Sequence, residues 1–252
     1  MIERMINESV TLDARFCGPP DSGNGGVTVG HLARRIDGPA KVTLRAPPPL
    51  GVAMQLTGDE KAVSLDCGAH RIGEAVIEPL DATPFRTLDR IAVDIDRTRA
   101  AEASFAGFTR HAFPTCFVCG PERREGDGLR LFAAPLEERV TAAWCPAASL
   151  ADEHGRIADV FLYAALDCPS YFALRDPQLV ALLGRMHAEV IDRPRPGDQL
   201  VVDAWALARE GRKRTTAVAL RNESGDVLAR AVNIWIEIDG AVPQPPVPSV
   251  TS

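Results

Sequence analysis

The sequence of 252 residues predicts an α+β protein made of two tandem halves, each a curved antiparallel sheet wrapped around a central helix. Two observations carry this prediction. The same order of elements, a helix followed by several strands, occurs in residues 10–78 and again in residues 128–238. In each half a turn with proline and glycine, at residues 47–51 and 193–197, follows the first strand after the helix. Wrapping a sheet around a helix buries the apolar faces of both.

The first half contains one predicted helix and several strands. Residues 25–36 form the helix, because their apolar residues recur at the i, i+3, i+4 and i+7 positions of one helical face. A loop rich in turn-forming residues, 19–23, precedes it. The predicted strands are residues 10–16, 41–46, 52–56, 62–66 and 75–77.

The second half repeats this order with longer elements. Residues 159–174 form a helix with a strongly apolar face, bent or broken at Pro169, because proline removes a backbone donor and crowds the preceding turn. Asparagine and glycine in residues 222–226 predict a hairpin turn. The predicted strands are residues 129–133, 140–144, 184–191, 199–209, 214–222 and 227–238.

The boundaries follow from this order of elements. We expect a first half over residues 1–80, a connector over 81–115 and a second half over 116–240. Within the connector, residues 96–105 have a helical pattern. The tail, 241–252, is rich in proline and serine, which predicts disorder.

Composition and charge exclude several classes of function. The net charge is −6 without a long basic run, so we expect no nucleic-acid partner. No stretch approaches about 18 apolar residues, and the N-terminus lacks the apolar run of a signal peptide, so we expect no membrane partner. The six cysteines are then expected to be reduced thiols in a cytoplasmic protein.

A resemblance to a known family adds a function to this architecture. Residues 184–239 resemble the strand region of hotdog-fold acyl-CoA thioesterases, with a Pro-Gly-Asp turn, a Gly-Asp hairpin turn and an alanine-rich last strand. Residues 114–121, with Gly128-Leu129, resemble a Cys-Phe-x-Cys-Gly-Pro segment that opens some thioesterase-like hotdog domains. The first half matches only in element order and in Asn24-Gly25-Gly26. The tandem arrangement is similar to double-hotdog acyl-CoA thioesterases, which implies a tandem double hotdog that acts on acyl-CoA or another acyl thioester.

The resemblance also implies a catalytic arrangement. In the family, the thioester carbonyl lies at the N-terminus of the central helix, where unpaired amides stabilise developing negative charge. Carried over, the Gly26 amide with Gly25 would hold the carbonyl oxygen, and Asn24 would orient water or substrate. A carboxylate from the opposing helix acts as base or nucleophile, and the matching position here is Asp167.

The spacing of these residues predicts a single working site. In related single-domain thioesterases the acid lies about seven residues, or two helical turns, beyond the second glycine. Counted from Gly26 that position is Ala33, and counted back from Asp167 it is Val160. Each half therefore has one component and lacks the other. We expect residues 24–26 to face Asp167 across the halves, and the reciprocal site of Ala33 and Asp159-Val160 to be inactive.

The substrate pocket is expected to involve aromatic residues of the second helix. Phe161, Tyr163 and Tyr171 are core residues that could also bound an acyl tunnel. His31, on the first helix, is expected to approach the pocket, with an ordinary surface or core histidine as the alternative.

The cysteines give no strong prediction of a metal or cofactor. Cys116 and Cys119 form a lone Cys-x-x-Cys pair, and we expect a buried loop cluster without metal. A zinc site would need His111, Cys145 or His154 nearby. Cys168 has no histidine partner that would make it a nucleophile. No cofactor is expected.

The sequence thus favours an acyl-CoA thioesterase that uses water, and it leaves alternatives open. One is a non-catalytic acyl-CoA or lipid-binding hotdog protein, and another is a scaffold. A hotdog hydratase or dehydratase is a further alternative, but its Asp/His pairing is missing, since no carboxylate lies four or five residues before His31. The tandem chain could also pair again as a homodimer of double hotdogs.

Overall fold

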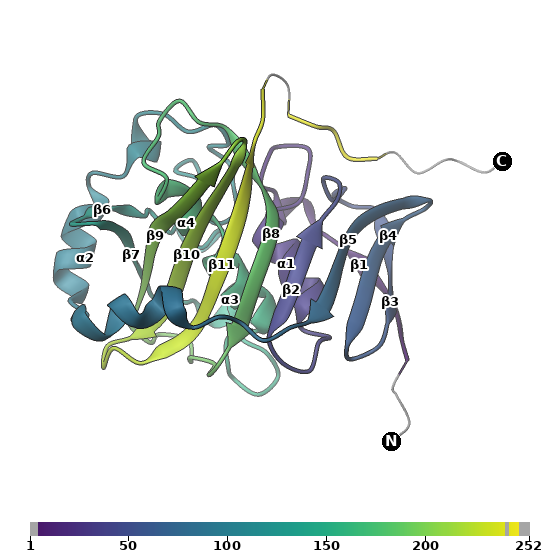
Figure 1. Cartoon of the computed structure of the whole chain (residues 1–252), viewed down its shortest axis with the longest axis horizontal. Coiled ribbons are helices and arrows are strands. Elements are labelled where there is room, and N and C mark those ends of the chain that lie inside the picture. Colours follow the sequence, from purple (N-terminus) through teal and green to yellow (C-terminus); the bar gives the residue numbers. More distant parts are fainter. Residues whose placement is uncertain (1–4, 240–241, 247–252) are drawn as a thin grey trace.

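The computed structural model describes residues 5–239 and 242–246 (Figure 1). The tail that the sequence predicts to be disordered, 241–252, lies outside the described residues except for 242–246, which form neither helix nor strand. No helix within the described ranges has the length and apolar character that a membrane crossing requires.

All strands of the described chain join one antiparallel sheet, in the order β1-β3-β4-β5-β2-β8-β11-β10-β9-β7-β6. Figure 1 shows this sheet running from β1 and β3 at one end to β7 and β6 at the other. The strands of the first half are β1 (Ile6–Thr11), β2 (Ala40–Leu44), β3 (Ala53–Gly58), β4 (Ala62–Cys67) and β5 (His70–Ile77). Those of the second half are β6 (Ala134–Leu136), β7 (Arg139–Trp144), β8 (Ala181–Val190), β9 (Leu200–Glu210), β10 (Lys213–Asn222) and β11 (Val227–Glu237).

The two halves meet where β2 pairs with β8. The register places Ala40 opposite Ala188 and Thr43 opposite Arg185. The Arg185 Nε also donates to the Thr43 hydroxyl at 3.1 Å. This pairing makes the two sheets continuous, and it places the central helices of the two halves side by side.

The central helices are α1 (Gly25–Ala33) in the first half and α3 (Asp159–Ala165) in the second, with α4 (Cys168–Phe172) directly after α3. They lie behind the middle of the sheet in Figure 1. The α1 residues Val29, Leu32 and Ala33 are buried, as the helical spacing predicts. The connector contains α2 (Ile95–Glu102), near β7, and the 3₁₀ helix η2 (Thr83–Arg90). Three shorter 3₁₀ helices complete the described elements: η1 (Ala14–Phe16), η3 (Ala106–Phe108) and η4 (Ala148–Leu150).

Glycines bring α1 and α3 unusually close together. A Cβ atom at Gly26 would lie 2.8 Å from the Ala164 Cα, and one at Gly30 would lie 2.6 Å from the Val160 Cα. The two glycines are one helical turn apart, as are the two residues that they face. A side chain at either glycine would therefore force the helices apart.

A buried ion pair attaches the connector to the second half. The Arg221 side chain is 1% exposed and Asp203 is fully buried, and the two form an ion pair. Arg139 Nε donates to the other Asp203 oxygen at 2.8 Å. Arg221 Nη1 also donates to the Ile91 carbonyl, which follows η2, at 2.7 Å. Both oxygens of the buried carboxylate thus have charged partners.

Two predicted elements differ from the structure. Residues 129–133 are not a strand, because the amides of Leu129 and Leu131 donate to the carbonyls of Phe117 and Val118 in the Cys-x-x-Cys segment. The predicted helix over 159–174 is broken, as expected, but α3 ends at Ala165 and α4 begins at Cys168, so the break lies ahead of Pro169 rather than at it. A proline ring collides with the carbonyl of the fourth preceding residue, which explains why α3 ends there.

Smaller differences concern the ends of elements. The first strand is Ile6–Thr11 rather than 10–16, and the 3₁₀ turn Ala14–Phe16 follows it. The connector helix is Ile95–Glu102 rather than 96–105, and α1 ends at Ala33 rather than at residue 36. Strand β5 begins at His70, five residues before the predicted start.

Candidate active site

The N-terminus of α1 presents two hydrogen-bond donors to the second half. Asn24 is the N-cap residue, and its Oδ1 accepts the Val27 amide at 2.9 Å. This bond fixes the side chain and leaves its Nδ2 to donate to Asp167 Oδ2 at 2.9 Å. The Gly26 amide donates to the same oxygen, also at 2.9 Å. The structure therefore brings Asn24, Gly26 and Asp167 together across the two halves.

Asp167 lies in the break between α3 and α4 and is 2% exposed. Its Oδ2 has two donors, whereas its Oδ1 is buried without a hydrogen-bond partner among the described residues. Burial raises the pKa of this carboxyl to about 7, and the Cys116 sulfur adds to the rise. The Gly26 amide and the Asn24 side chain act in the opposite direction. The carboxyl is thus held in place but poorly solvated.

A cavity of about 570 Å³ lies beside this carboxylate. Both halves contribute to its wall, with Asn24 and Gly25 from the first and Asp167 from the second. Most of the wall is apolar; it includes Phe113, Tyr171, Phe172, Leu179, Leu183 and Trp235. An apolar cavity with a few converging polar groups is the usual form of a small-molecule site.

The comparisons with known proteins bear on the fold. No family model matches the chain, and no curated protein matches it. Solved structures match over nearly the whole length. A candidate thioesterase II of Thermobifida fusca has a TM-score of 0.60 at 15% identity, covering 92% of this chain and 92% of that one. A tesB protein of Mycobacterium avium subspecies paratuberculosis has a TM-score of 0.59 at 12% identity, covering 92% and 93%. The chain is a double hotdog.

A third match agrees with this fold. A candidate oleoyl thioesterase of Lactobacillus plantarum has a TM-score of 0.56 at 8% identity, covering 95% of this chain and 98% of that one. At such low identities the likeness shows the fold alone. The predicted fold class, a tandem double hotdog, is confirmed.

Of the four residues predicted to bind substrate, Tyr171 is in the cavity wall of this double hotdog. Its hydroxyl donates to the Leu179 carbonyl. Phe161 instead packs against Phe16 and Phe117, with ring centroids 6.0 Å from each. Tyr163 is 3% exposed and lies outside the lining. Tyr163 therefore belongs to the core, and Phe161 is a partly buried residue packed against it.

His31 also lies outside the cavity lining. It is near Arg34, Arg35 and Glu8, and its Nδ1 is buried without a partner among the described residues. Burial lowers the pKa of His31 to about 4, and Arg34 lowers it further while Glu8 opposes the shift. Helical spacing places a residue on a face of its helix, but this face of α1 does not reach the cavity.

This position predicts an acid sensitivity. A histidine with a lowered pKa contributes stability that is present above its ordinary pKa of about 6.5 and is lost as the pH falls through about 4. We expect His31→Gln, which cannot be protonated in this range, to reduce the fall in Tm between pH 7 and pH 4. An equal fall in Tm in His31→Gln and in the native chain would contradict this assignment. The control is His154→Gln at an exposed position, which is expected to behave as the native chain does.

The reciprocal position of the double hotdog has no comparable arrangement. Ala33 is buried, and the Val160 backbone packs against Gly30. Asp159, the carboxylate nearest to this position in sequence, accepts from Arg193 Nη2 at 2.8 Å in an exposed ion pair. Among the described residues of the two central helices, it is the N-terminus of α1, at Asn24 and Gly26, that donates to a buried carboxylate, that of Asp167.

Three cysteines form part of the cavity wall, and sequence reasoning found only two of them as a pair. The sulfur atoms of Cys116, Cys119 and Cys168 lie within 4.8 Å of one another, and the thiols are buried. Of the residues that the sequence offers as further ligands, His111 lines the same cavity but does not belong to this group of ligand atoms. Cys145 is exposed and donates to the Gly197 carbonyl, and His154 is exposed. Cys168 follows Asp167 directly, so the carboxylate and the thiols share one wall.

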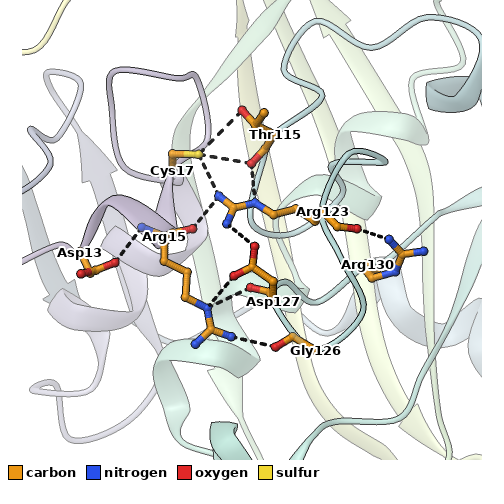
Figure 2. A network of polar contacts seen from close by, with 8 residues as sticks. All are labelled: Asp13, Arg15, Cys17, Thr115, Arg123, Gly126, Asp127 and Arg130. Carbon is orange, nitrogen blue, oxygen red and sulfur yellow. Dashed lines mark hydrogen bonds and ion pairs between the residues drawn. The ribbon is translucent and has the colours of Figure 1, made fainter.

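The Cys-x-x-Cys segment is attached to the first half by the guanidinium of Arg123 (Figure 2). Arg123 donates to the carbonyls of Thr115 and Arg15, each at 2.7 Å, and to the Cys17 sulfur at 3.0 Å. Its Nη1 pairs with Asp127 at 3.1 Å. The planar guanidinium of Arg123, with its fork of N–H donors, thus connects the start of the Cys-x-x-Cys segment to the loop after β1.

This network predicts a loss of stability in Arg123→Lys. A lysine ammonium cannot reach all four partners of the Arg123 guanidinium, so at least one largely buried acceptor loses its donor. The free energy of unfolding is expected to fall by about 1.5–3 kcal/mol. Urea unfolding measures the loss. The control is Arg124→Lys at the exposed neighbouring position, which is expected to change the free energy of unfolding by less than about 0.5 kcal/mol. Equal stabilities of the two variants would contradict the role of the fork.

Proposed function

We propose that this double hotdog hydrolyses an acyl thioester with water, with acyl-CoA as the substrate class. The observation that carries the proposal is the buried carboxylate of Asp167, which two donors from the other half hold at the wall of an apolar cavity. The named functions of the solved structures with this fold support the same class of reaction.

In the proposed reaction Asp167 acts as a general base. It takes a proton from water while the water oxygen adds to the thioester carbonyl carbon. The C–S bond then breaks, and the leaving sulfur receives the proton, which yields a carboxylic acid and a free thiol. Asn24 and the Gly26 amide keep the carboxylate in position for both transfers.

The Gly25 amide is the proposed donor to the carbonyl oxygen. The Gly26 amide, which the sequence suggests for this role, is engaged by Asp167. Gly25 is the first residue of α1 and lines the cavity, and no described residue accepts a hydrogen bond from its amide. An unpaired amide at a helix start stabilises the negative charge that develops on the oxygen.

The apolar lining of the cavity suits the acyl group of the substrate. A volume of about 570 Å³ is within the range of small-molecule pockets, about 300–1,000 Å³. The wall near Tyr171, Phe172 and Trp235 is aromatic. We therefore expect a preference for apolar acyl chains.

The test is the release of free CoA from a series of acyl-CoA thioesters of increasing acyl length. Chromatographic detection of CoA avoids interference from the six cysteines of the chain. We expect saturable release with an optimum at one range of lengths. No release above the spontaneous rate for any length would contradict the proposal.

A second candidate, acyl-thioester binding without hydrolysis, is favoured by one observation. The Gly26 amide donates to Asp167. While this hydrogen bond is intact, the amide is not available to donate to a substrate carbonyl. Thioether analogues of acyl-CoA separate the two functions, because they bind but cannot be hydrolysed. Tight binding of the thioether without turnover of the thioester would favour this candidate.

A further inference from the structure

The three thiols of the cavity wall come from two separated parts of the chain. Cys116 and Cys119 belong to the loop before Gly120, and Cys168 begins α4. The sulfurs of Cys116 and Cys168 are 3.6 Å apart, and all three sulfurs lie within 4.8 Å of one another. Thioester hydrolysis as proposed above uses none of them.

The loop is folded tightly enough to place both of its sulfurs on one side. The Gly120 amide donates to the Cys116 carbonyl at 2.9 Å, which closes the turn. A Cβ atom at residue 120 would lie 2.5 Å from the carbonyl oxygens of Cys116 and Pro114, so the turn requires glycine. The Arg123 fork holds the start of this turn in place. The two thiols are therefore preorganised before any ligand binds.

The spacing of the sulfurs fits a shared cation. Tetrahedral zinc with Zn–S bonds of about 2.3 Å holds its sulfurs about 3.8 Å apart, close to the observed 3.6 Å. A disulfide would instead need the sulfurs to approach to about 2.05 Å. Thiolates are soft ligands that favour Zn²⁺ over Mg²⁺ or Ca²⁺. We propose that Cys116, Cys119 and Cys168 bind one Zn²⁺ ion, with a fourth coordination position supplied from the cavity.

The fourth position follows from the ligands at hand. Asp167 does not belong to the group of ligand atoms that lie within 4.8 Å of one another, so the described residues supply three sulfurs. All three cysteines line the cavity, which gives water or a small ligand access to the ion. Three protein ligands with one exchangeable position are typical of catalytic rather than structural zinc sites. The proposal does not depend on thioester hydrolysis, because metal binding is measured without substrate.

The first test uses Co²⁺ as a spectroscopic substitute for Zn²⁺ on the full chain. The protein is treated with a chelator and a non-thiol reductant, the chelator is removed, and Co²⁺ is titrated. We expect thiolate-to-cobalt charge-transfer absorption that saturates at one ion per chain and disappears when Zn²⁺ is added. Titration without charge-transfer absorption would overturn the proposal.

The second test separates the three thiols from the other cysteines. Cys168→Ser is expected to weaken Co²⁺ binding at least about tenfold and to lower the charge-transfer intensity. Cys145→Ser also removes one cysteine, but at an exposed position outside the group, and is expected to match the native chain. The reverse outcome, with binding lost in Cys145→Ser alone, would overturn the assignment.

A measurement on the native chain covers the case in which Cys168→Ser does not fold. A ligand that binds only the folded state raises Tm. Zn²⁺ is therefore expected to raise the Tm of the metal-free native chain and of Cys145→Ser, and Mg²⁺ is expected to leave both unchanged. No shift with Zn²⁺ would contradict the proposal, whatever the activity of the protein.

Discussion

Asp167→Asn is expected to lower kcat for thioester hydrolysis by about 10²–10⁴-fold, the usual contribution of a general base. The substitution keeps the shape of the side chain, so the Gly26 amide still has an oxygen to which it can donate. An amide cannot accept the proton of the attacking water. KM is expected to change little, because the apolar wall that would hold the acyl chain is unaltered.

The matched control for this variant is Asp159→Asn. Asp159 is on α3, eight positions before Asp167, and it forms an exposed ion pair with Arg193. Its substitution is expected to change kcat less than about threefold, since an exposed pair contributes about 0–1 kcal/mol to stability. Unchanged turnover in Asp167→Asn would remove this residue from the mechanism, and an equal loss in both variants would point to general damage to α3.

The sequence contains much of the information on α1 and on the strands. The helical spacing of Val29, Leu32 and Ala33 reports local structure, because a helix fixes which residues share a face. The last three strands are long and separated by strong turn residues, and their predicted ends fall within a residue or two of those observed. Local periodicity, however, does not tell which neighbour a face will meet. His31 shows this, since it is on the predicted helix but outside the cavity lining.

The candidate site depends on contacts between residues distant in the chain. The meeting of Asn24 with Asp167 could be inferred from the way hotdog halves pair, and the structure brings them together. That the Gly26 amide would be engaged by Asp167 could not be inferred, because it depends on how closely α1 approaches α3. The third cysteine was missed for a similar reason: Cys168 is about fifty residues from Cys116, and only the fold places their sulfurs together.

Residues 129–133 show why an apolar run can be misassigned. Their alternation of apolar residues is typical of a strand, and Leu129 and Leu131 are indeed buried. Their amides, however, donate to Phe117 and Val118 rather than to a sheet strand, and Arg130 has a positive φ of 55°. Burial can be predicted from the pattern, whereas the hydrogen-bond partner of an extended segment is chosen by the tertiary fold.

Gly26→Ala is expected to lower both stability and activity, because the added methyl group meets atoms that cannot move independently. Its Cβ would lie 2.6 Å from the Asp167 Cβ, 2.8 Å from the Ala164 Cα and 2.9 Å from the Tyr163 carbonyl oxygen. Two of these are backbone atoms of α3, so α1 and α3 must separate, at a cost of about 1–3 kcal/mol. The movement also lengthens the hydrogen bond from the Gly26 amide to Asp167.

Gly30→Ala separates the two effects. It creates a similar overlap, with its Cβ 2.6 Å from the Val160 Cα, but it lies one helical turn beyond Gly26, the glycine that contacts Asp167. Both variants are expected to lose comparable free energy of unfolding in urea. Below the unfolding transition, Gly26→Ala is expected to lose more than about tenfold in kcat, because misplacement of a catalytic group can cost about 10²-fold. Gly30→Ala is expected to retain most of its turnover. Equal kcat losses would show that α1 and α3 respond as one rigid unit, and that the Gly26 amide has no separate part in holding the carboxylate.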